Sequence, residues 1–338
     1  MVAGDEVVGE GFHAAAGGPH AETLALRQAG SRAAGATLYV TLEPCSHFGR
    51  TPPCTEALIG AGVARVVACH ADPDPRVSGR GFARLREAGI AVEVGPLAER
   101  AAVLNLHYLA AKRLGRPGVT LKWAMSLDGK IAAASGESRW ISSPRARRWA
   151  LALREEHDAL LVGVGTVLAD DPRLNRRLGF AGRPNLRVVL DRRLRLPVGS
   201  RLLEEQGPLV VYTEAEPGER WQALEEAGAE VVRLAAVEPT AVLAELAGRG
   251  VQSLLVEGGG EVSAAFVAAG CYDRVLAVVA PKLVGGRAAP SPLGGVGVGL
   301  LTEAPVLEGL TVGRLGEDLL MTGYRSGCLR DLLPSAGG

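Results

Sequence analysis

The sequence has few aromatic residues, at 4% of its 338 residues, and no excess of either charge, since 37 Lys and Arg balance 37 Asp and Glu. A dedicated nucleic-acid-binding protein is usually basic, because contacts to phosphates supply most of its affinity. No apolar run reaches the ~18 residues that a membrane span needs, and residues 1–10 lack the apolar stretch of a signal peptide. We therefore expect a small-molecule substrate, with no nucleic-acid and no membrane partner.

Cysteine is also scarce. An odd, sparse set in a chain of this length argues against a disulfide framework and predicts a reducing, cytoplasmic location. The five cysteines are Cys45, Cys54, Cys69, Cys271 and Cys328. The pair Cys45 and Cys54 stands close in sequence, so it calls for another explanation than a disulfide.

What the chain does have is length, 45 glycines and an alternation of β-rich and helical stretches. The length favours two domains, and the alternation predicts parallel sheets with crossover helices. In the first part we expect strands at 36–42 and 63–69 and helices at 19–30, 54–61 and 80–88. The pattern loosens at 114–118, which we interpret as a linker between domains at 1–114 and 119–330.

A second α/β series follows the linker. Its predicted strands cover 119–125, 157–164, 186–191, 208–212, 229–234, 252–257 and 273–280. Its predicted helices cover 143–154, 219–227 and 239–249. The second domain therefore has a sheet of its own.

Three residues of the first domain form a candidate metal site. His20 opens a predicted helix, while Cys45 and Cys54 follow a predicted strand. One imidazole and two thiolates suit Zn²⁺, and a catalytic zinc keeps its fourth position for water, whose pKa it lowers. Glu22 lies two residues beyond His20, so it could take a proton from that water and pass it to a leaving ammonia. This His-x-Glu and Pro-Cys arrangement is typical of zinc nucleobase deaminases.

Two other interpretations stand beside the catalytic one. Cys45 and Cys54 could be ordinary small core residues that recur by chance near a histidine. The three ligands could also hold a structural zinc, although structural sites normally have four protein ligands. The order of the motif and its position at a helix start and a strand end favour the catalytic interpretation.

The segments HAE, TLEPCSHFGRTPPC and DPDPRVSGRG resemble the deaminase half of the bifunctional riboflavin-biosynthesis deaminase–reductases. Eight residues separate Cys45 from Cys54, and this long loop is characteristic of that family. The resemblance implies a cytidine-deaminase-like α/β/α fold, zinc on His20, Cys45 and Cys54, and Glu22 as the proton shuttle. It also implies that the substrate pocket is lined by His13, His47 and Arg50.

The start of the chain departs from the family pattern. The resemblance implies a helix and a strand with a Pro-Asn-Pro turn, whereas residues 1–6 already resemble the hairpin that follows that strand. We therefore expect the family's first helix and first strand to be absent here. We interpret this as a start codon assigned too late, because the zinc motif is intact.

Four motifs mark the second domain at predicted strand ends, where α/β enzymes bind ligands. They are KWAMSLDGK at 122–130, SRWIS at 138–142, VGVGT at 162–166 with DDPRLNRR at 170–177, and VEGGGE at 256–261. Glycines at a strand-to-helix turn let backbone amides approach a phosphate. They also serve purely structural turns, and no Rossmann fingerprint is present.

Residues 119–325 resemble the reductase half of the same family, whose fold is like dihydrofolate reductase. The resemblance implies NADPH contacts at Ala124, Trp140, Thr166, Asp170, Gly259, Gly260, Glu261, Val262, Ser263, Ala264 and Ala265. It implies substrate contacts at Lys122, Ser138, Arg154, Leu174, Arg177 and Glu257. Arg154 and Arg177 suit a phosphate clamp, because guanidinium groups stay charged and bind in two-pronged fashion.

As the resemblance implies, the first domain deaminates 2,5-diamino-6-(5-phosphoribosylamino)pyrimidin-4(3H)-one. The second domain then reduces 5-amino-6-(5-phosphoribosylamino)uracil with NADPH. One alternative is a reductase with a non-catalytic, zinc-stabilised N-terminal domain, and another is a nucleoside or tRNA deaminase. The resemblance also implies a homo-oligomer, either a dimer or a tetramer.

Overall fold

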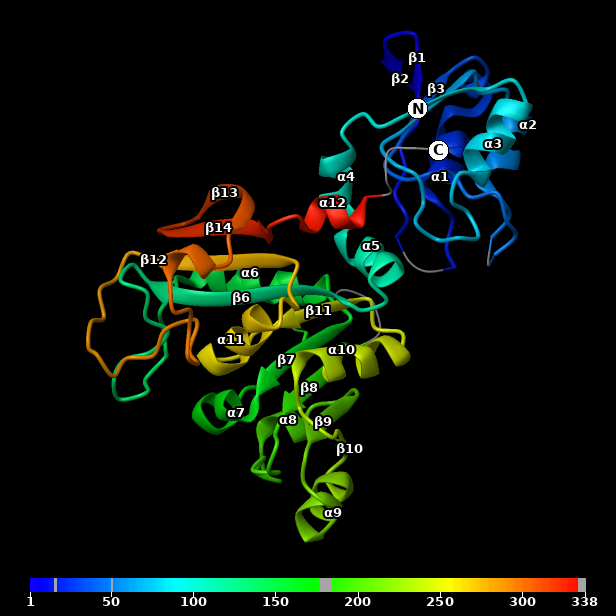
Figure 1. Cartoon of the computed structure of the whole chain (residues 1–338). Helices are drawn as coiled ribbons and strands as arrows, with labels where there is room; N and C mark the ends of the chain where they lie inside the picture. The colour runs from blue at the N-terminus through cyan, green and yellow to red at the C-terminus, as the bar shows by residue number, and fades with distance from the viewer. Residues whose placement is uncertain (15–16, 50, 177–183, 334–338) are drawn as a thin grey trace. The chain divides into compact units, whose positions relative to one another are not determined.

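The computed structural model describes residues 1–14, 17–49, 51–176 and 184–333. It divides the chain after Arg113 into an N-terminal and a C-terminal unit (Figure 1). The described residues from Leu329 on belong to the N-terminal unit, not to the C-terminal one as the expected domain end at residue 330 implied. A hydrogen bond from Arg113 Nη2 to the carbonyl oxygen of Leu333, 3.2 Å long, ties the end of the chain to the N-terminal unit.

The N-terminal unit is built on one small sheet. Its strands are β1 (Val2–Ala3), β2 (Glu6–Val7), β3 (Thr37–Val40), β4 (Arg65–Ala68) and β5 (Ala91–Val94). Its helices are α1 (Ala21–Ala29), the 3₁₀ helix η1 (Gly30–Ala33), α2 (Cys54–Gly60), α3 (Arg80–Glu87), α4 (Ala98–Leu104), α5 (Leu106–Arg113) and α12 (Cys328–Leu332).

The strand order of this sheet is β2-β1-β3-β4-β5, with β3, β4 and β5 parallel and β1 antiparallel to both of its neighbours. Helices α1, α2 and α3 pack on one face, since Ala25, Leu58 and Leu85 join Leu38 and Val66 in one buried cluster. Small alanines on α1 let the helix approach the strands closely. The opposite face is covered only in part, because Tyr39 of β3 is 58% exposed.

The C-terminal unit has a larger sheet. Its strands are β6 (Gly118–Ser126), β7 (Ala159–Gly163), β8 (Leu186–Leu190), β9 (Leu209–Thr213), β10 (Glu230–Arg233), β11 (Ser253–Val256), β12 (Arg274–Ala280), β13 (Leu307–Leu315) and β14 (Asp318–Arg325). Its helices are α6 (Pro144–Glu155), α7 (Val164–Asp170), α8 (Arg201–Glu204), α9 (Glu219–Glu226), α10 (Pro239–Gly248), α11 (Gly260–Ala268) and the 3₁₀ helix η2 (Leu301–Glu303).

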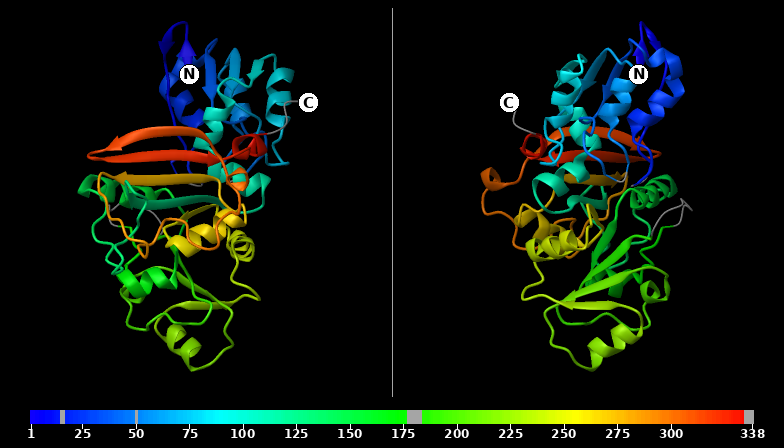
Figure 2. Two further views of the ribbon diagram at one scale, coloured as in Figure 1. Left: turned by 60° about the vertical axis from the view of Figure 1, so that its left-hand side comes forward. Right: turned by 90° about the vertical axis from the view of Figure 1, so that its right-hand side faces the viewer.

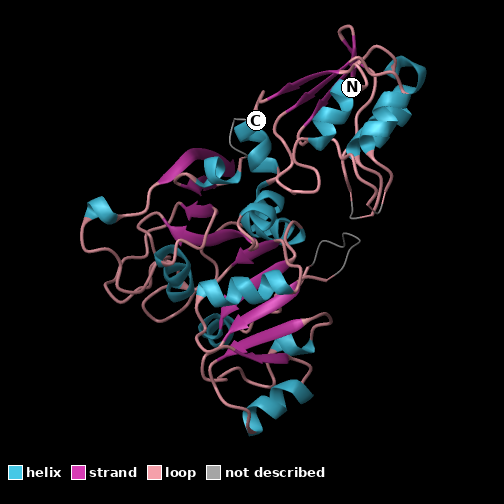
Figure 3. Ribbon diagram, turned by 45° about the vertical axis from the view of Figure 1, so that its right-hand side comes forward, coloured by secondary structure: helices cyan, strands magenta, loops and turns pink. Residues whose placement is uncertain are grey.

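The strand order of the larger sheet is β10-β9-β8-β7-β11-β6-β12-β14-β13, and the strands run parallel except for the hairpin β13–β14. Neighbouring residues of β7 show that both faces are covered. Leu161 packs with α10 and α11, whereas Leu160 packs with α6. Figure 3 shows helices beside the strands of this sheet. Strands buried on two faces need continuous apolar runs, which explains the Val- and Leu-rich segments in the sequence.

The mixed α/β fold expected from the sequence is confirmed, and each predicted strand and helix lies within two residues of its expected bounds. Several elements were not predicted from the sequence, among them β5, α4, α5, α7, α8, α12 and the hairpin β13–β14. The hairpin lies beside β12 and leaves β13 at the end of the sheet (Figure 2). Among the described residues no helix is long and apolar enough to span a bilayer.

A buried ion pair holds the start of the C-terminal unit. Arg116 binds both carboxylate oxygens of Asp273, at 2.7 and 2.8 Å, and Asp273 is 0% exposed. The same carboxylate accepts the backbone N–H of Val119 at 2.8 Å. The pair therefore joins the residues before β6 to the residue before β12.

We expect Arg116→Ala to lower the free energy of unfolding of this unit by about 3–5 kcal/mol, because it leaves a buried carboxylate without its cation. The matched control is Arg233→Ala, whose ion pair with Glu216 is 50% and 70% exposed. Such exposed pairs contribute about 1 kcal/mol or less. Urea titrations followed by tryptophan fluorescence report on this unit, because the four tryptophans of the chain all lie in it. Equal losses in the two variants would contradict the prediction.

Candidate functional site

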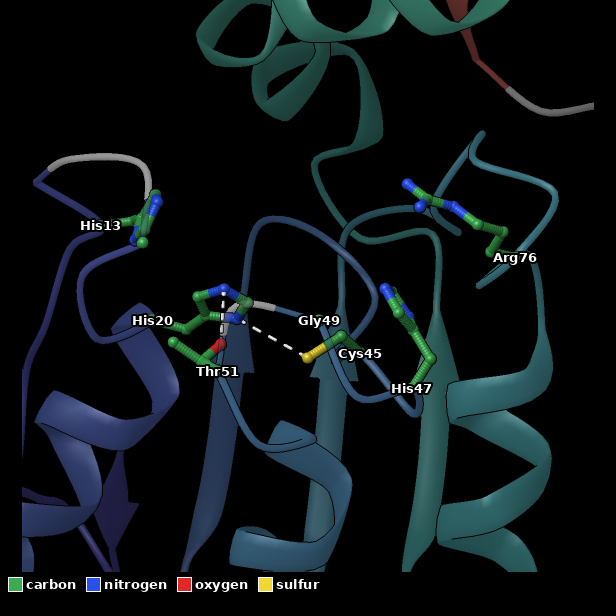
Figure 4. A pocket seen from close by; sticks show the side chains of 8 residues that line it. His13, His20, Cys45, His47, Gly49, Thr51 and Arg76 are labelled. Carbon is green, nitrogen blue, oxygen red and sulfur yellow. Dashed lines mark hydrogen bonds between the residues drawn. The ribbon is translucent and has the colours of Figure 1, made fainter.

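Three residues predicted as metal ligands come together in the N-terminal unit. His20 is the residue before α1, Cys45 follows the carboxyl end of β3, and Cys54 begins α2. Their ligand atoms all lie within 4.8 Å of one another. His20 Nδ1 is 3.6 Å from Cys45 Sγ (Figure 4). The same nitrogen is 3.3 Å from Cys54 Sγ.

These distances fit a zinc ion. Tetrahedral zinc with Zn–S of about 2.3 Å and Zn–N of about 2.0–2.1 Å places nitrogen and sulfur roughly 3.5 Å apart. The two nitrogen–sulfur distances of 3.3 and 3.6 Å fall on either side of that value. Three protein ligands leave one coordination position for water, which is the pattern of a catalytic zinc site.

Thr51 orients the histidine ligand. Its Oγ1 lies 3.3 Å from His20 Nε2, the ring nitrogen that does not face the sulfurs. When Nε2–H donates to this hydroxyl, Nδ1 keeps its lone pair for a metal. Thr51 belongs to the long loop between the two cysteines, and its role was not predicted from the sequence.

The two thiols are linked by hydrogen bonds. The pKa of the Cys45 thiol is lowered to about 5, chiefly because it accepts a hydrogen bond from the Cys54 thiol, while burial opposes the shift. The backbone N–H of Cys54 also donates to Cys45 Sγ at 3.3 Å. The pKa of Cys54 is raised correspondingly. This hydrogen bond favours the thiolate form of Cys45, which is the form that binds a metal.

Glu22 lies in the first turn of α1 and is 8% exposed. Burial raises the pKa of its carboxyl group, although a hydrogen bond with Cys54 and the charge of His20 oppose the shift in part. A raised pKa lies closer to neutral pH, and a general acid–base works best when its pKa is near the pH of the reaction. Glu22 is therefore well suited to move a proton beside the metal cluster.

A cavity of about 540 Å³ opens over this cluster. Its lining includes His13 and His47, which the sequence analysis placed in the substrate pocket, whereas Arg50 lies outside the described residues. The His13 and His20 rings meet edge to face with their centroids 5.1 Å apart. Thr51 and Arg76 also line the cavity, and the sequence analysis assigned neither. Arg76 lies in the DPDPRVSGRG motif, so a cation within a family motif was the sequence feature that could have predicted it as a cavity residue.

The C-terminal unit has a second cavity, of about 1320 Å³. It collects the predicted substrate residues Lys122, Ser138, Arg154, Leu174 and Glu257. It also collects most of the predicted cofactor residues, namely Ala124, Trp140, Thr166, Asp170, Gly259, Gly260, Glu261, Val262 and Ala265. Two further cofactor residues are not in its lining, since Ser263 is 1% exposed and Ala264 faces Gly295. Arg177 lies outside the described residues.

Glu257 is the buried centre of this cavity. Arg154 Nη2 lies 2.6 Å from its Oε2, and Lys122 Nζ lies 3.5 Å from its Oε1. Burial alone would raise the pKa of this carboxyl, but the charges of Arg154 and Lys122 outweigh it and lower the pKa. Glu257 is therefore an ionised acceptor, and Oε1 has no hydrogen-bond partner among the described residues.

The glycines around α11 divide into two groups. A Cβ on Gly163 or Gly258 would come within 2.7 Å of the Val262 side chain, so packing of the helix alone explains these two. A Cβ on Gly165 would meet nothing within 4 Å, and one on Gly259 would meet only Thr166 Oγ1, at 3.7 Å. These two glycines border the cavity and leave room for a phosphate-bearing cofactor at the start of α11.

Three arginines of one loop also reach this cavity. Arg192, Arg193 and Arg195 follow the carboxyl end of β8 and line the cavity. None of these three arginines was predicted from the sequence. The sequence feature that could have predicted them is the run DRRLR, which follows a predicted strand of a parallel sheet at the end where ligands commonly bind.

Comparison with known proteins covers both units. Residues 117–320 match the family model described as the RibD C-terminal domain. Residues 1–70 match the model of the cytidine and deoxycytidylate deaminase zinc-binding region. The riboflavin biosynthesis protein RibD of Aquifex aeolicus is 43% identical over 317 residues, which are 94% of this chain and 88% of that protein. RibD of Escherichia coli is 42% identical, over 85% of this chain and 82% of its own length.

Solved structures are similar over the same span. RibD of Acinetobacter baumannii superposes with a TM-score of 0.83 at 39% identity, covering 96% of this chain and 90% of that one. A diaminohydroxyphosphoribosylaminopyrimidine deaminase/5-amino-6-(5-phosphoribosylamino)uracil reductase from Thermotoga maritima gives 0.81 at 36% identity, covering 94% and 88%. The likeness therefore covers the segments that form both sheets.

We expect Thr51→Val to weaken zinc binding about 10- to 100-fold, because His20 loses the hydrogen bond that orients its ring. Thr51→Ser is the matched control, since it keeps the hydroxyl and should bind zinc as the unsubstituted chain does. The measurement is competition for zinc with a chelator of known affinity. Equal affinities of the valine and serine variants would contradict this role of Thr51.

Proposed function

The chain belongs to the RibD family of riboflavin-biosynthesis deaminase–reductases, and from this premise we propose how its two cavities divide the work between them. The N-terminal cavity deaminates 2,5-diamino-6-(5-phosphoribosylamino)pyrimidin-4(3H)-one. The C-terminal cavity reduces 5-amino-6-(5-phosphoribosylamino)uracil to its ribityl product. The observation that carries the proposal is the cluster of His20, Cys45 and Cys54 beside the buried Glu22.

In the N-terminal cavity, His20, Cys45 and Cys54 hold zinc. When bound, zinc supplies a Lewis acid that lowers the pKa of water toward neutrality. Glu22 accepts a proton from the attacking water and returns it to the amino group that leaves as ammonia. His13 and His47 position the pyrimidine against these residues, because they line the same cavity.

In the C-terminal cavity, Glu257 and Lys122 bind hydroxyl groups of the ribosyl chain, and Arg154 binds its phosphate. Glu257 keeps one acceptor oxygen without a hydrogen-bond partner among the described residues, which suits a hydroxyl donor. NADPH supplies the hydride when bound. The described residues here need only hold the two reactants close and exclude water, because positioning accounts for much of such a reaction.

The cofactor would extend from Ala124 and Trp140 toward the start of α11. Gly165 and Gly259 leave space for its phosphates, and Thr166 and Asp170 flank them. Arg192, Arg193 and Arg195 offer charged donors for a further phosphate, which distinguishes NADPH from NADH.

The chain acts as a homo-oligomer in the cytoplasm. The five cysteines are all free thiols, which suits a reducing compartment. Leu310 and Val312 lie on the edge strand β13 and are 55% and 60% exposed. Apolar side chains on an open sheet edge are usually covered by another chain, so a second copy over β13 would form the dimer.

Glu22→Gln should abolish ammonia release, lowering it at least about 100-fold, because the amide cannot shuttle a proton. Zinc content should stay at one ion per chain, and NADPH oxidation with the deaminated substrate should be unchanged. Glu56→Gln is the matched control, since Glu56 is an exposed glutamate that pairs with Arg84. Deamination by the Glu22→Gln variant at the unsubstituted rate would refute the proton-shuttle role. If the unsubstituted chain bound zinc but released no ammonia, the result would favour a reductase with a non-catalytic, zinc-stabilised N-terminal domain. Ammonia release from cytidine or tRNA would favour a nucleoside or tRNA deaminase.

Val312→Asp should reduce the oligomer to monomers, because it buries a charge in the proposed interface. Light scattering of the purified chain measures the mass directly. Arg314→Ala, on the same strand, provides a control that leaves the apolar surface in place. A mass that is unchanged by Val312→Asp would place the interface elsewhere.

A further inference from the structure

The loop between β4 and α3 brings an unassigned cation to the deaminase cavity. Arg76 lies in this loop, which we define as residues 72–79, and its side chain lines the cavity together with His13 and His47. Figure 4 shows Arg76 above His47, on the other side of the cavity from His13. The resemblance to the deaminase family assigns no role to this residue.

The loop is held from below by Glu43. This buried carboxylate, 3% exposed, accepts the backbone N–H groups of Asp72 at 3.1 Å and Gly79 at 2.8 Å, one at each end of the loop. It also accepts those of Gly81 and Phe82 at the start of α3. Because Glu43 stands two residues before Cys45, the loop keeps a set position relative to the metal ligands.

A glycine lets the start of α3 approach this segment. A Cβ on Gly81 would lie 2.1 Å from the carbonyl oxygen of Pro44, so no larger residue fits without displacing the helix. The close approach brings the amides of Gly81 and Phe82 within reach of Glu43. The backbone that carries Arg76 is therefore held in place at both ends of the loop by hydrogen bonds to Glu43.

Arg76 is itself oriented by a buried acid. Its Nε and Nη2 donate to the two oxygens of Asp74 at 3.0 and 2.7 Å, and the Asp74 side chain is 7% exposed. Lys112 Nζ binds the same carboxylate at 2.9 Å. These hydrogen bonds to cations lower the pKa of Asp74 strongly. A guanidinium has five N–H groups, so three of those on Arg76 remain for a ligand.

We propose that Arg76 is a specificity-determining residue of the deaminase reaction and binds the phosphate of the phosphoribosyl substrate. The proposal rests on the proposed deaminase function. The amino group that leaves must lie at His20, Cys45 and Cys54, so the phosphate at the far end of the substrate lies toward the rim of the cavity. Arg76 is at this rim, with a side chain that is 69% exposed.

The charges around Arg76 determine how such a contact would act. Asp72 and Asp74 balance Arg76 and Lys112, so this group exerts little net attraction on a distant anion. Recognition therefore depends on directed hydrogen bonds from the guanidinium, which match a phosphate in two-pronged geometry. Lysine in its place would offer a point charge without that geometry.

The test compares two substrates in one assay. Ammonia release is measured for the phosphoribosyl substrate and for the same compound without its phosphate. We expect Arg76→Ala to lower kcat/KM about 10- to 100-fold for the phosphorylated compound, mainly through KM, because charge-assisted hydrogen bonds are lost. The dephosphorylated compound should react as it does with the unsubstituted chain. Arg76→Lys should recover only part of the loss.

Arg84→Ala is the matched control, because Arg84 is an exposed arginine of α3 that pairs with Glu56 and does not line the cavity. Its kinetics should equal those of the unsubstituted chain. Zinc content and NADPH oxidation in the same samples report whether each variant is folded. Equal losses of Arg76→Ala on both substrates, or an unchanged preference for the phosphate, would overturn the proposal. Absence of ammonia release from the unsubstituted chain would instead refute the deaminase function, and the role of Arg76 with it.

Discussion

Glu43, Glu257 and Asp273 are carboxylates removed from water, and a charge in that situation must find donors or a cation close by. Glu43 finds four backbone amides, and through them it holds the segment that shapes one side of the deaminase cavity. Glu257 finds Arg154 and Lys122, and the three together form the floor of the reductase cavity. Asp273 finds Arg116 and the first strand of its unit. Two of these three buried acids thus hold segments or side chains that border the two cavities.

Both sites also follow from the direction of the strands. Cys45 comes after β3 and Glu257 after β11, each at the carboxyl end of a strand in a parallel set. Parallel strands bring these ends to one edge of the sheet, where helix starts such as that of α1 or α11 also lie. Residues from distant parts of the chain therefore meet there. The antiparallel hairpin β13–β14 forms the edge of the larger sheet beyond β12. None of its residues lines the cavity.

The absence of net charge on the chain does not make its cavities neutral. Arginines line both cavities, and some of them are paired with buried acids. Arg76 is oriented by Asp74, and Arg154 by Glu257. Such pairs cancel at a distance but leave individual N–H groups directed into the cavity. An anionic substrate would thus be recognised by geometry at short range.

By itself, the sequence determined the alternating strands and helices, and with them the α/β fold, because apolar periodicity and turn residues act over a few neighbours. It also determined the metal cluster, since His20, Cys45 and Cys54 belong to a motif whose residue types leave little other chemistry. Only the tertiary structure decided that Thr51 contacts His20 from 31 positions away and that Glu43 reaches Gly81 across 38. The same holds for Lys112, which binds Asp74, the acid that orients Arg76, from 38 positions away. Contacts over such separations form when helices pack on the sheet, and local propensity carries no information about them.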